Sequence, residues 1–399
     1  MTARLRPALG AGLLAAALAL TAAPASALPD RPGPAKPAPE RPAPPGLTPR
    51  AWTPVDLGTL GGESTVPSAV NDHGQVVGRS QVEDGRWHAF LWTDGVMTDL
   101  TPDAQYGNAT DVSNRGEVSG WVQPAAGEES DGFVWARGRT TVVVDGGYAL
   151  RVNERGQVGG VVDETETTRE NPFVWTAGTR VDLPPPPFPG AFGVSGLVDL
   201  NDKGVVLGRG EFDDDNDLVY LWSRGRFTEL RDASGSVLLG VDLNDRGSVA
   251  GVVWNEARAR EAALWQRGRI VRIGALPGAT WTEAAALNES DVVVGTSTAQ
   301  RGTPGTAFVW RAGVLTAVED GDGWSTATAV NDAGLVAGTI GDDETAQAYV
   351  WQDGRLVRLG MPTSEDVSVT DLSEKGHVLT TTGDFRGQRA TLWLPSRRS

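Results

Sequence analysis

One short motif recurs eight times along this chain and limits the folds that the chain can adopt. The first copy, at residues 71–78, reads NDHGQVVG. The eight copies begin at Asn71, Ser113, Asn153, Asn201, Asn244, Asn288, Asn331 and Ser373. Their spacing runs from 40 residues (113 to 153) to 48 residues (153 to 201). That period is about the length of one four-stranded blade of a β-propeller.

Each repeat predicts four short strands. In the first repeat, residues 68–70 form a strand and the NDHG turn follows, because Asn accepts backbone hydrogen bonds and Gly tolerates a positive φ. Residues 75–78, 88–92 and 96–100 are the next three strands. In the sixth repeat Asp291 replaces the turn glycine, and Asp is among the few other residues that adopt this conformation.

The third strand predicts how the repeats pack. Phe90 and Trp92 lie two residues apart and project to one face, whereas Leu91 projects to the other. Both faces are apolar, so each repeat must be covered by neighbours of the same kind. A tryptophan ends this strand in every repeat, at Trp92, Trp135, Trp175, Trp222, Trp265, Trp310, Trp351 and Trp393.

The ends of the repeat region indicate a closed ring. The eighth repeat stops after Trp393 and lacks a fourth strand, while residues 55–57 resemble a fourth strand and precede the first repeat. An N-terminal strand that completes the last sheet removes exposed sheet edges. We therefore expect an all-β, eight-bladed β-propeller of four-stranded blades. It forms a single domain over residues 52–395, with a C-terminal tail at 396–399.

The sequence resembles a known family of repeats. Residues 88–92 read HAFLW, residues 56–62 read DLGTLGG, and both accompany the NDHG turn. This combination resembles the bacterial extracellular repeats of the HAF family over residues 55–393. The resemblance implies an exported protein of propeller type, and it implies no reaction.

The N-terminal region predicts export. Arg4 and Arg6 precede an apolar run at residues 8–20, and residues 25–27 read ASA, as in a signal peptide cleaved after Ala27. The apolar run is shorter than the roughly 20 residues that span a bilayer, so we expect no transmembrane segment. Residues 28–51 are rich in proline and predict a disordered linker. The expected location is extracellular.

The composition of the chain limits the classes of partner that we expect it to bind. The formal net charge is −16, and such a surface repels phosphate backbones, so we expect no nucleic-acid partner. An extracellular glycan or a protein remains open, and we expect a monomer. The chain has no cysteine, which excludes disulfides and thiol chemistry.

Three aromatic residues are candidates for ligand binding. Tyr106, Trp281 and Trp324 each lie seven residues before the first residue of a motif turn. They therefore occupy one equivalent place, on the face that carries the long and variable loops, where binding residues usually lie. Aromatic faces there can stack on sugar rings. The alternative is that they pack between neighbouring blades.

Acidic residues suggest two further possibilities. The run at residues 213–217 places Asp213, Asp215 and Asp217 at alternate positions, as in a Ca²⁺ loop. It lacks the glycine and the bidentate glutamate of such loops, so a solvated charge run is the alternative, and we expect no other cofactor. Aspartates also recur two residues before the turn, where they line a channel or bind backbone groups, at Asp111, Asp199, Asp242 and Asp371.

Catalytic signatures are sparse. The three histidines lack metal-ligand spacing, and no G-x-S-x-G motif lies at a strand-to-helix junction. The sequence therefore predicts a secreted, non-catalytic propeller that binds a polymer or a protein, including a glycan, through its long-loop face. One alternative is a structural surface module without a small ligand. Another is an extracellular polysaccharide hydrolase or lyase that uses loop carboxylates.

Overall fold

The computed structural model describes residues 51–396 except 165–168, 189–190, 213–216, 320, 322, 343 and 385–386. The chain divides into two units, Met1–Pro49 and Arg50–Ser399, and the description below concerns the second. The predicted signal peptide and nearly all of the predicted linker lie outside the described residues. In the described part every regular element is a β-strand, and no helix there is long and apolar enough to cross a membrane.

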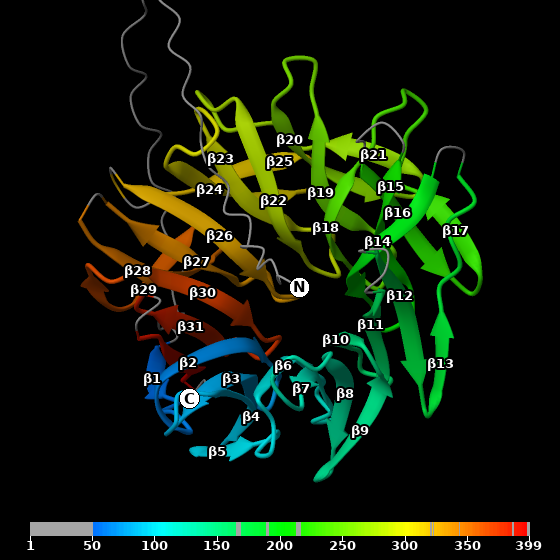
Figure 1. Ribbon diagram of the computed structural model, residues 1–399. Helices are drawn as coiled ribbons and strands as arrows, with labels where there is room; N and C mark the ends of the chain where they lie inside the picture. Colours follow the sequence, from blue (N-terminus) through cyan, green and yellow to red (C-terminus); the bar gives the residue numbers. More distant parts are fainter. Residues whose placement is uncertain are drawn as a thin grey trace, which may run out of the picture. The chain divides into compact units, whose positions relative to one another are not determined.

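The described strands form seven sheets, which Figure 1 shows side by side around a common centre. Five of them each contain four antiparallel strands that are consecutive in the chain. These strands are β10 (Gly147–Val152), β11 (Gln157–Glu164), β12 (Arg169–Thr176), β13 (Thr179–Asp182); β14 (Ala191–Leu200), β15 (Val206–Phe212), β16 (Asp217–Ser223), β17 (Arg226–Glu229); β18 (Leu239–Leu243), β19 (Val249–Trp254), β20 (Arg260–Gln266), β21 (Arg269–Arg272); β22 (Trp281–Leu287), β23 (Val293–Thr298), β24 (Gly305–Arg311), β25 (Val314–Val318); β26 (Trp324–Val330), β27 (Val336–Gly341), β28 (Ala346–Gln352) and β29 (Arg355–Thr363).

The sixth sheet joins the two ends of the repeat region. Its order is β1 (Trp52–Asp56), β32 (Arg389–Pro395), β31 (Val378–Thr382) and β30 (Val367–Leu372). β1 and β32 pair antiparallel, from Trp52 opposite Pro395 to Asp56 opposite Thr391. A strand from before the first repeat therefore completes the sheet of the last one.

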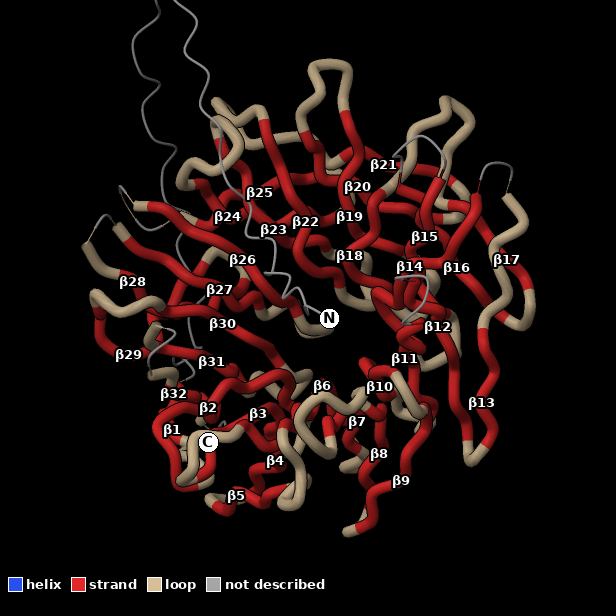
Figure 2. Tube along the Cα trace, in the orientation of Figure 1, coloured by secondary structure: helices blue, strands red, loops and turns tan. Residues whose placement is uncertain are grey.

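The seventh sheet contains eight strands. They are β2 (Gly61–Val70), β3 (Val76–Val82), β4 (Trp87–Thr93), β5 (Val96–Asp99), β6 (Tyr106–Val112), β7 (Val118–Gln123), β8 (Asp131–Ala136) and β9 (Arg139–Val144). A single parallel pair, Trp87 opposite Tyr106, joins the first four strands to the last four. The number of sheets is thus seven, so the predicted count of eight blades is not confirmed, whereas the all-β architecture is. Figure 2 shows the strands and the loops that connect them.

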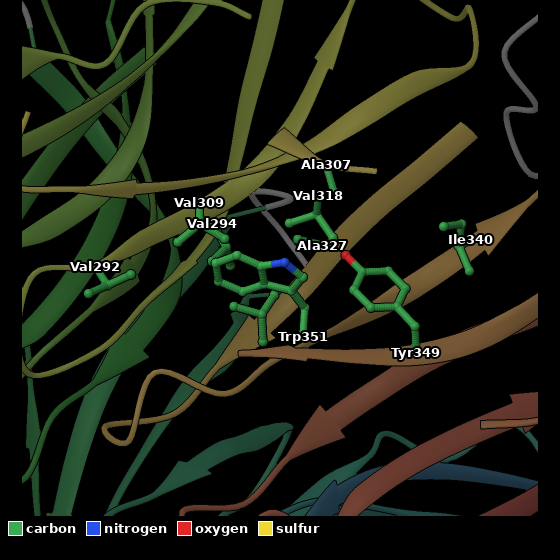
Figure 3. Packing of buried hydrophobic residues seen from close by; sticks show 10 residues of the cluster. Val292, Val294, Ala307, Val309, Val318, Ala327, Ile340, Tyr349 and Trp351 are labelled. Atoms are coloured by element: carbon green, nitrogen blue, oxygen red, sulfur yellow. The ribbon is translucent and has the colours of Figure 1, made fainter. Parts of the chain in front are cut away.

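The core lies between adjacent sheets. Phe90 and Trp92 belong to one buried cluster and Leu91 to another, as the alternation along the strand predicts. Figure 3 shows the same principle farther along the chain, where Trp351 and Tyr349 of β28 pack in one cluster with residues of the preceding sheet. Each sheet therefore buries both of its faces against its neighbours.

The motif turns have one geometry. In the first turn, Oδ1 of Asn71 accepts hydrogen bonds from the backbone N–H of His73 and Gln75, both at 3.0 Å. Nδ2 of Asn71 donates to the carbonyl oxygen of Ser113, in the turn of the next repeat. Asp291 has a φ of 58°, which confirms that it replaces a glycine in the left-handed region.

The second residue of each turn forms a belt of hydrogen bonds around the molecule. Its backbone N–H donates to the side-chain oxygen of the second residue in the next turn, and at the last junction Lys375 donates to Asp72 instead. The eight distances lie between 2.6 and 3.0 Å. The acceptor side chains are those of Asp72, Asn114, Glu154, Asp202, Asp245, Glu289, Asp332 and Glu374.

The belt predicts that its acceptor oxygens stabilise the fold. We expect Asp72→Ala to lower the free energy of unfolding by about 0.5–1 kcal/mol, because the N–H of Lys375 loses its acceptor in an exposed hydrogen bond. Asp72→Asn keeps an acceptor oxygen, and asparagine already occupies the same place at Asn114, so this control should cost less. Thermal unfolding of both variants measures the difference, and equal losses would contradict a role for the acceptor.

Two buried tyrosines offer a second test of the core. The hydroxyl of Tyr349 donates to the carbonyl oxygen of Thr326 at 3.1 Å, whereas the buried hydroxyl of Tyr220 has no hydrogen-bond partner among the described residues. Tyr349→Phe should therefore cost about 1 kcal/mol, and Tyr220→Phe should be neutral or stabilising. Denaturant unfolding of the two variants decides this, and a loss in Tyr220→Phe equal to that in Tyr349→Phe would refute it.

Candidate functional site

The three candidate aromatic residues occupy equivalent positions but do not form one site. Tyr106, Trp281 and Trp324 are the first residues of β6, β22 and β26, which begin their respective repeats. Among the ring contacts of the described residues, none joins two of the three. Each must therefore be judged by its own surroundings.

Tyr106 takes part in packing. Its ring stacks on Trp121 with centroids 5.1 Å apart and planes 6° apart. Nη1 of Arg79 donates to the hydroxyl of Tyr106 at 2.6 Å, and the same guanidinium lies 5.1 Å from the ring centroid of Trp87. Burial raises the pKa of the Tyr106 hydroxyl. These contacts support the packing alternative for this residue.

Trp281 lies in a cluster of rings and charges. It contacts Trp254 edge to face with centroids 6.0 Å apart, and the guanidinium groups of Arg260 and Arg301 each lie 5.9 Å from its ring. Nε1 of Trp281 donates to Glu283 at 3.0 Å, and Arg260 pairs with the same carboxylate at 3.0 Å. The indole N–H of Trp281 and Nη1 of Arg260 thus share the carboxylate of Glu283 as their partner.

Trp324 lies at a cavity of about 390 Å³. The lining comes from both β22–β25 and β26–β29, so the cavity is situated between two neighbouring sheets. Nε1 of Trp324 donates to the carbonyl oxygen of Asp342 at 3.0 Å, which fixes the edge of the indole. Among the three aromatic candidates, Trp324 is the one that lines this cavity.

The deeper wall of the cavity is polar and already organised. Ser325 and Gln347 are buried. The hydroxyl of Ser325 donates to the carbonyl oxygen of Val318 at 2.8 Å, and Nε2 of Gln347 donates to that of Gly360 at 3.2 Å. Fixed side chains of this kind need no rearrangement to receive a ligand, which lowers the entropic cost of binding.

The rim of the cavity carries charges of both signs. Glu319, Asp342 and Arg358 are exposed there. Oδ1 of Asp342 accepts hydrogen bonds from the backbone N–H of Glu344 and Thr345. These bonds hold the pKa of the Asp342 carboxyl below its usual value, so this carboxylate stays ionised through neutral and mildly acidic pH.

Sequence reasoning missed most of this cavity. The run at 342–344 is visibly acidic, but Arg358 and Gln347 belong to no motif, and nothing in the sequence places them beside Trp324. Of the proposed calcium residues, Asp213 and Asp215 lie outside the described residues, and the description of Asp217 covers its backbone alone. In the part of the chain that is described, no group of three potential metal ligands occurs.

The repeated aspartates bind backbone groups, as one of the two sequence alternatives predicts. Oδ1 of each accepts the N–H of the following residue. Oδ2 of Asp242, for example, accepts the N–H of Leu287 at 2.7 Å, and Leu287 lies on the first strand of the next sheet. Each carboxylate thus links the first strands of two repeats, and the four that do so are Asp111, Asp199, Asp242 and Asp371.

Burial shifts the titration of these carboxyls. It raises the pKa of Asp371 to about 6. It also raises the pKa of Asp242 to about 7, where the nearby charge of Asp199 adds to the effect of burial. Arg151 occupies the equivalent place in its own repeat, and its Nε lies 3.5 Å from Asp199, so its positive charge partly offsets this repulsion.

Comparison with solved structures identifies the fold. The chain is similar to a structure from a study of two prolyl endopeptidases, with a TM-score of 0.55 and 12% identity over 80% of this chain and 54% of that one. It is also similar to the β-propeller domain of the trilobed protease from Pyrococcus furiosus (TM-score 0.49, 11% identity, 73% and 94%). A third similar structure is the acylaminoacyl peptidase of Pyrococcus horikoshii, with a TM-score of 0.48 and 12% identity over 74% of this chain and 53% of that one. The first and third matches span about half of the peptidase chain. No family model and no curated protein matches the chain.

The first of these matches corrects the expected function. The sequence predicted a secreted, non-catalytic propeller that binds a polymer or a protein through its long-loop face. That prediction is wrong, because the similar structure with a TM-score of 0.55 comes from a study of prolyl endopeptidases. At 12% identity this similarity shows the fold alone, so a function must be derived from the site itself.

The buried aspartates predict a pH dependence of stability. Because the pKa of Asp242 is about 7 in the folded protein and about 3.9 in the unfolded chain, the unfolded state ionises first as the pH rises. This carboxyl therefore lowers the free energy of unfolding progressively between about pH 4 and pH 7. Asp242→Ala, an exchange to the residue found at the equivalent Ala286, should flatten that decline. Urea unfolding of both proteins across this range tests it, and parallel profiles would contradict it.

Proposed function

We propose that this protein binds a small polar ligand in the cavity beside Trp324. The observation that supports the proposal is the cavity itself, whose volume of about 390 Å³ lies within the range of small-molecule sites. It combines an aromatic wall, a buried polar wall and a charged rim. A few fixed polar groups beside an aromatic surface are the usual means of orienting a small ligand.

Tyr106 and Trp281 lack these features. Tyr106 stacks on another ring, and the indole N–H of Trp281 is taken by Glu283. The indole N–H of Trp324 also donates a hydrogen bond, but its acceptor is the backbone carbonyl oxygen of Asp342, in a loop that lines the cavity. We therefore assign binding to Trp324 and packing to the other two.

We also propose several features of the whole protein. The chain is an eight-bladed propeller in which the eight-stranded sheet counts as two blades, a proposal supported by the single residue pair that joins its halves. Its repeats are of the HAF type, supported by residues 88–92 and the NDHG turn. It is a monomer, and it is exported, a proposal supported by the sequence of residues 1–27.

We further propose that the protein is not an enzyme. In the described part, His88 and Asp99 form a histidine–carboxylate pair whose Nδ1 and Oδ2 atoms lie 2.7 Å apart. The side chain of His88 is 3% exposed, so a substrate has no access to it. General acid–base catalysis requires a side chain within hydrogen-bonding reach of the substrate.

Binding is tested by calorimetric titration of the full chain with small polar molecules that include maltose and glycylphenylalanine. At least one should bind, and Trp324→Ala should weaken it about tenfold or more, because the stacking surface is lost. Trp281→Ala is the matched control and should leave the dissociation constant unchanged. Equal weakening by both variants, or the absence of any binding, would refute the proposal.

A further inference from the structure

We propose that the repeat formed by β26–β29 is a movable part of the molecule, and that its rotation away from the β22–β25 repeat widens the cavity beside Trp324. The inference rests on the proposed function and adds a device that regulates access to the same site. It follows from the contacts that join each repeat to its neighbours, which differ from one junction to the next.

Most junctions between repeats carry a link on the innermost strands, two residues before the motif turn. At four junctions an aspartate accepts the backbone N–H of the next repeat, and at a fifth Arg151 pairs with Asp199 at 3.5 Å. Alanine occupies this position at the other three, at Ala69, Ala286 and Ala329. All eight positions are described, and the β26–β29 repeat is the one among them without such a link on either side.

The backbone at Val330 shows the consequence. Val330 takes the place that Leu287 has in the preceding repeat, where the N–H of Leu287 donates to Oδ2 of Asp242 at 2.7 Å. The two inner strands carry their bulge at the same place, so the difference between them lies in the side chains. With alanine at both flanking positions, no carboxylate of the described residues accepts the N–H of Val330. The inner edge of β26 is therefore free to move relative to β22.

The turn ends of the same junction provide a pivot. Nδ2 of Asn288 donates to the carbonyl oxygen of Asn331 at 2.9 Å in a buried hydrogen bond, which fixes this end. The two belt hydrogen bonds of the β26–β29 repeat, from Glu289 to Asp332 and from Asp332 to Glu374, are exposed. Water can replace exposed hydrogen bonds during a small rotation, and a few residues at the end of an element suffice as a hinge.

Ser325 joins the two repeats at the loop end. Its hydroxyl accepts the backbone N–H of Ala307 at 2.9 Å and donates to the carbonyl oxygen of Val318 at 2.8 Å, and both partners belong to the β22–β25 repeat. Ser325 also lines the cavity beside Trp324. A rotation that breaks these two hydrogen bonds widens the cavity. A ligand that contacts both repeats favours the closed arrangement.

The chain has no cysteine, so one introduced thiol reports on one junction. Ala327 packs between β22–β25 and β26–β29 (Figure 3), and Ala284 has the equivalent place between β18–β21 and β22–β25. Ala327 is 3% exposed and Ala284 is 7% exposed, so burial alone predicts slower labelling at position 327. We expect the opposite. In the full chain, the thiol of Ala327→Cys should react with N-ethylmaleimide about tenfold or more faster than that of Ala284→Cys, because its junction opens more often.

Restoring the missing link should slow this reaction. Ala286→Asp places a carboxylate at the position that Asp242 occupies in the preceding repeat, so it supplies an acceptor for the N–H of Val330. Combined with Ala327→Cys, it should lower the labelling rate about threefold or more. The same exchange combined with Ala284→Cys should leave the rate unchanged, because Asp242 already links that junction. Ser325→Ala should accelerate labelling of Ala327→Cys, and thermal unfolding should show that every variant remains folded.

The outcomes separate the movement from the binding. Equal labelling rates for the two thiols, or a faster reaction at position 284, would overturn the inference. Maltose or glycylphenylalanine, if bound to saturation, should slow labelling of Ala327→Cys about tenfold. If a probe binds and labelling is unchanged, the proposed function stands and the regulation of access fails. If the two labelling rates differ as expected and no probe binds, the movement stands and the proposed function fails.

Discussion

The hydrogen-bonded belt of motif turns is the constraint on which the rest of the structure depends. Each turn presents a backbone N–H that finds an acceptor in the belt, where five of the eight hydrogen bonds are partly buried and three are exposed, and each such bond adds a modest amount of stability. In every case the acceptor comes from another repeat: Asn114 serves Asp72, and Asp72 in turn serves Lys375. Because every link needs a neighbour at a fixed distance, the belt holds the repeats in a fixed relation to one another even where the sequence between them varies.

The belt also explains where a site can arise. It fixes the motif turns, where a substitution at one position disturbs two repeats. The loops at the other ends of the same strands take no part in it, and they vary in length and composition from repeat to repeat. Trp324 and Asp342 belong to these loop ends, one at the start of β26 and the other after β27. A ligand cavity can therefore form between two sheets there without a cost to the contacts that hold the repeats together.

Much of the fold can be predicted from the sequence because the same pattern of turn and strand residues occurs eight times. The alternation of Phe90 and Leu91 and the positive φ of Asp291 follow from side-chain direction and backbone sterics. The belt could not be predicted, because its acceptors are of three residue types, Asp, Asn and Glu, which have in common only that each side chain carries an acceptor oxygen. The cavity could not be predicted either, since Arg358 and Trp324 lie on different strands and meet through tertiary structure. The number of sheets depends on one residue pair, Trp87 and Tyr106, which no periodicity reveals.

The buried aspartates show a compromise between linking the repeats and the cost of burying a charge. The carboxylate of Asp371 accepts one hydrogen bond from the N–H of Leu372 on its own strand and one from the N–H of Val70 in the next repeat. One side chain thus satisfies donors on two repeats. Alanine stands at the same place at positions 69, 286 and 329, so the fold tolerates the loss of the link at those junctions. At these junctions the belt and the apolar contacts between adjacent sheets hold the repeats together. The carboxylates add to it on the inner strands, and their elevated pKa values are the electrostatic cost of that position.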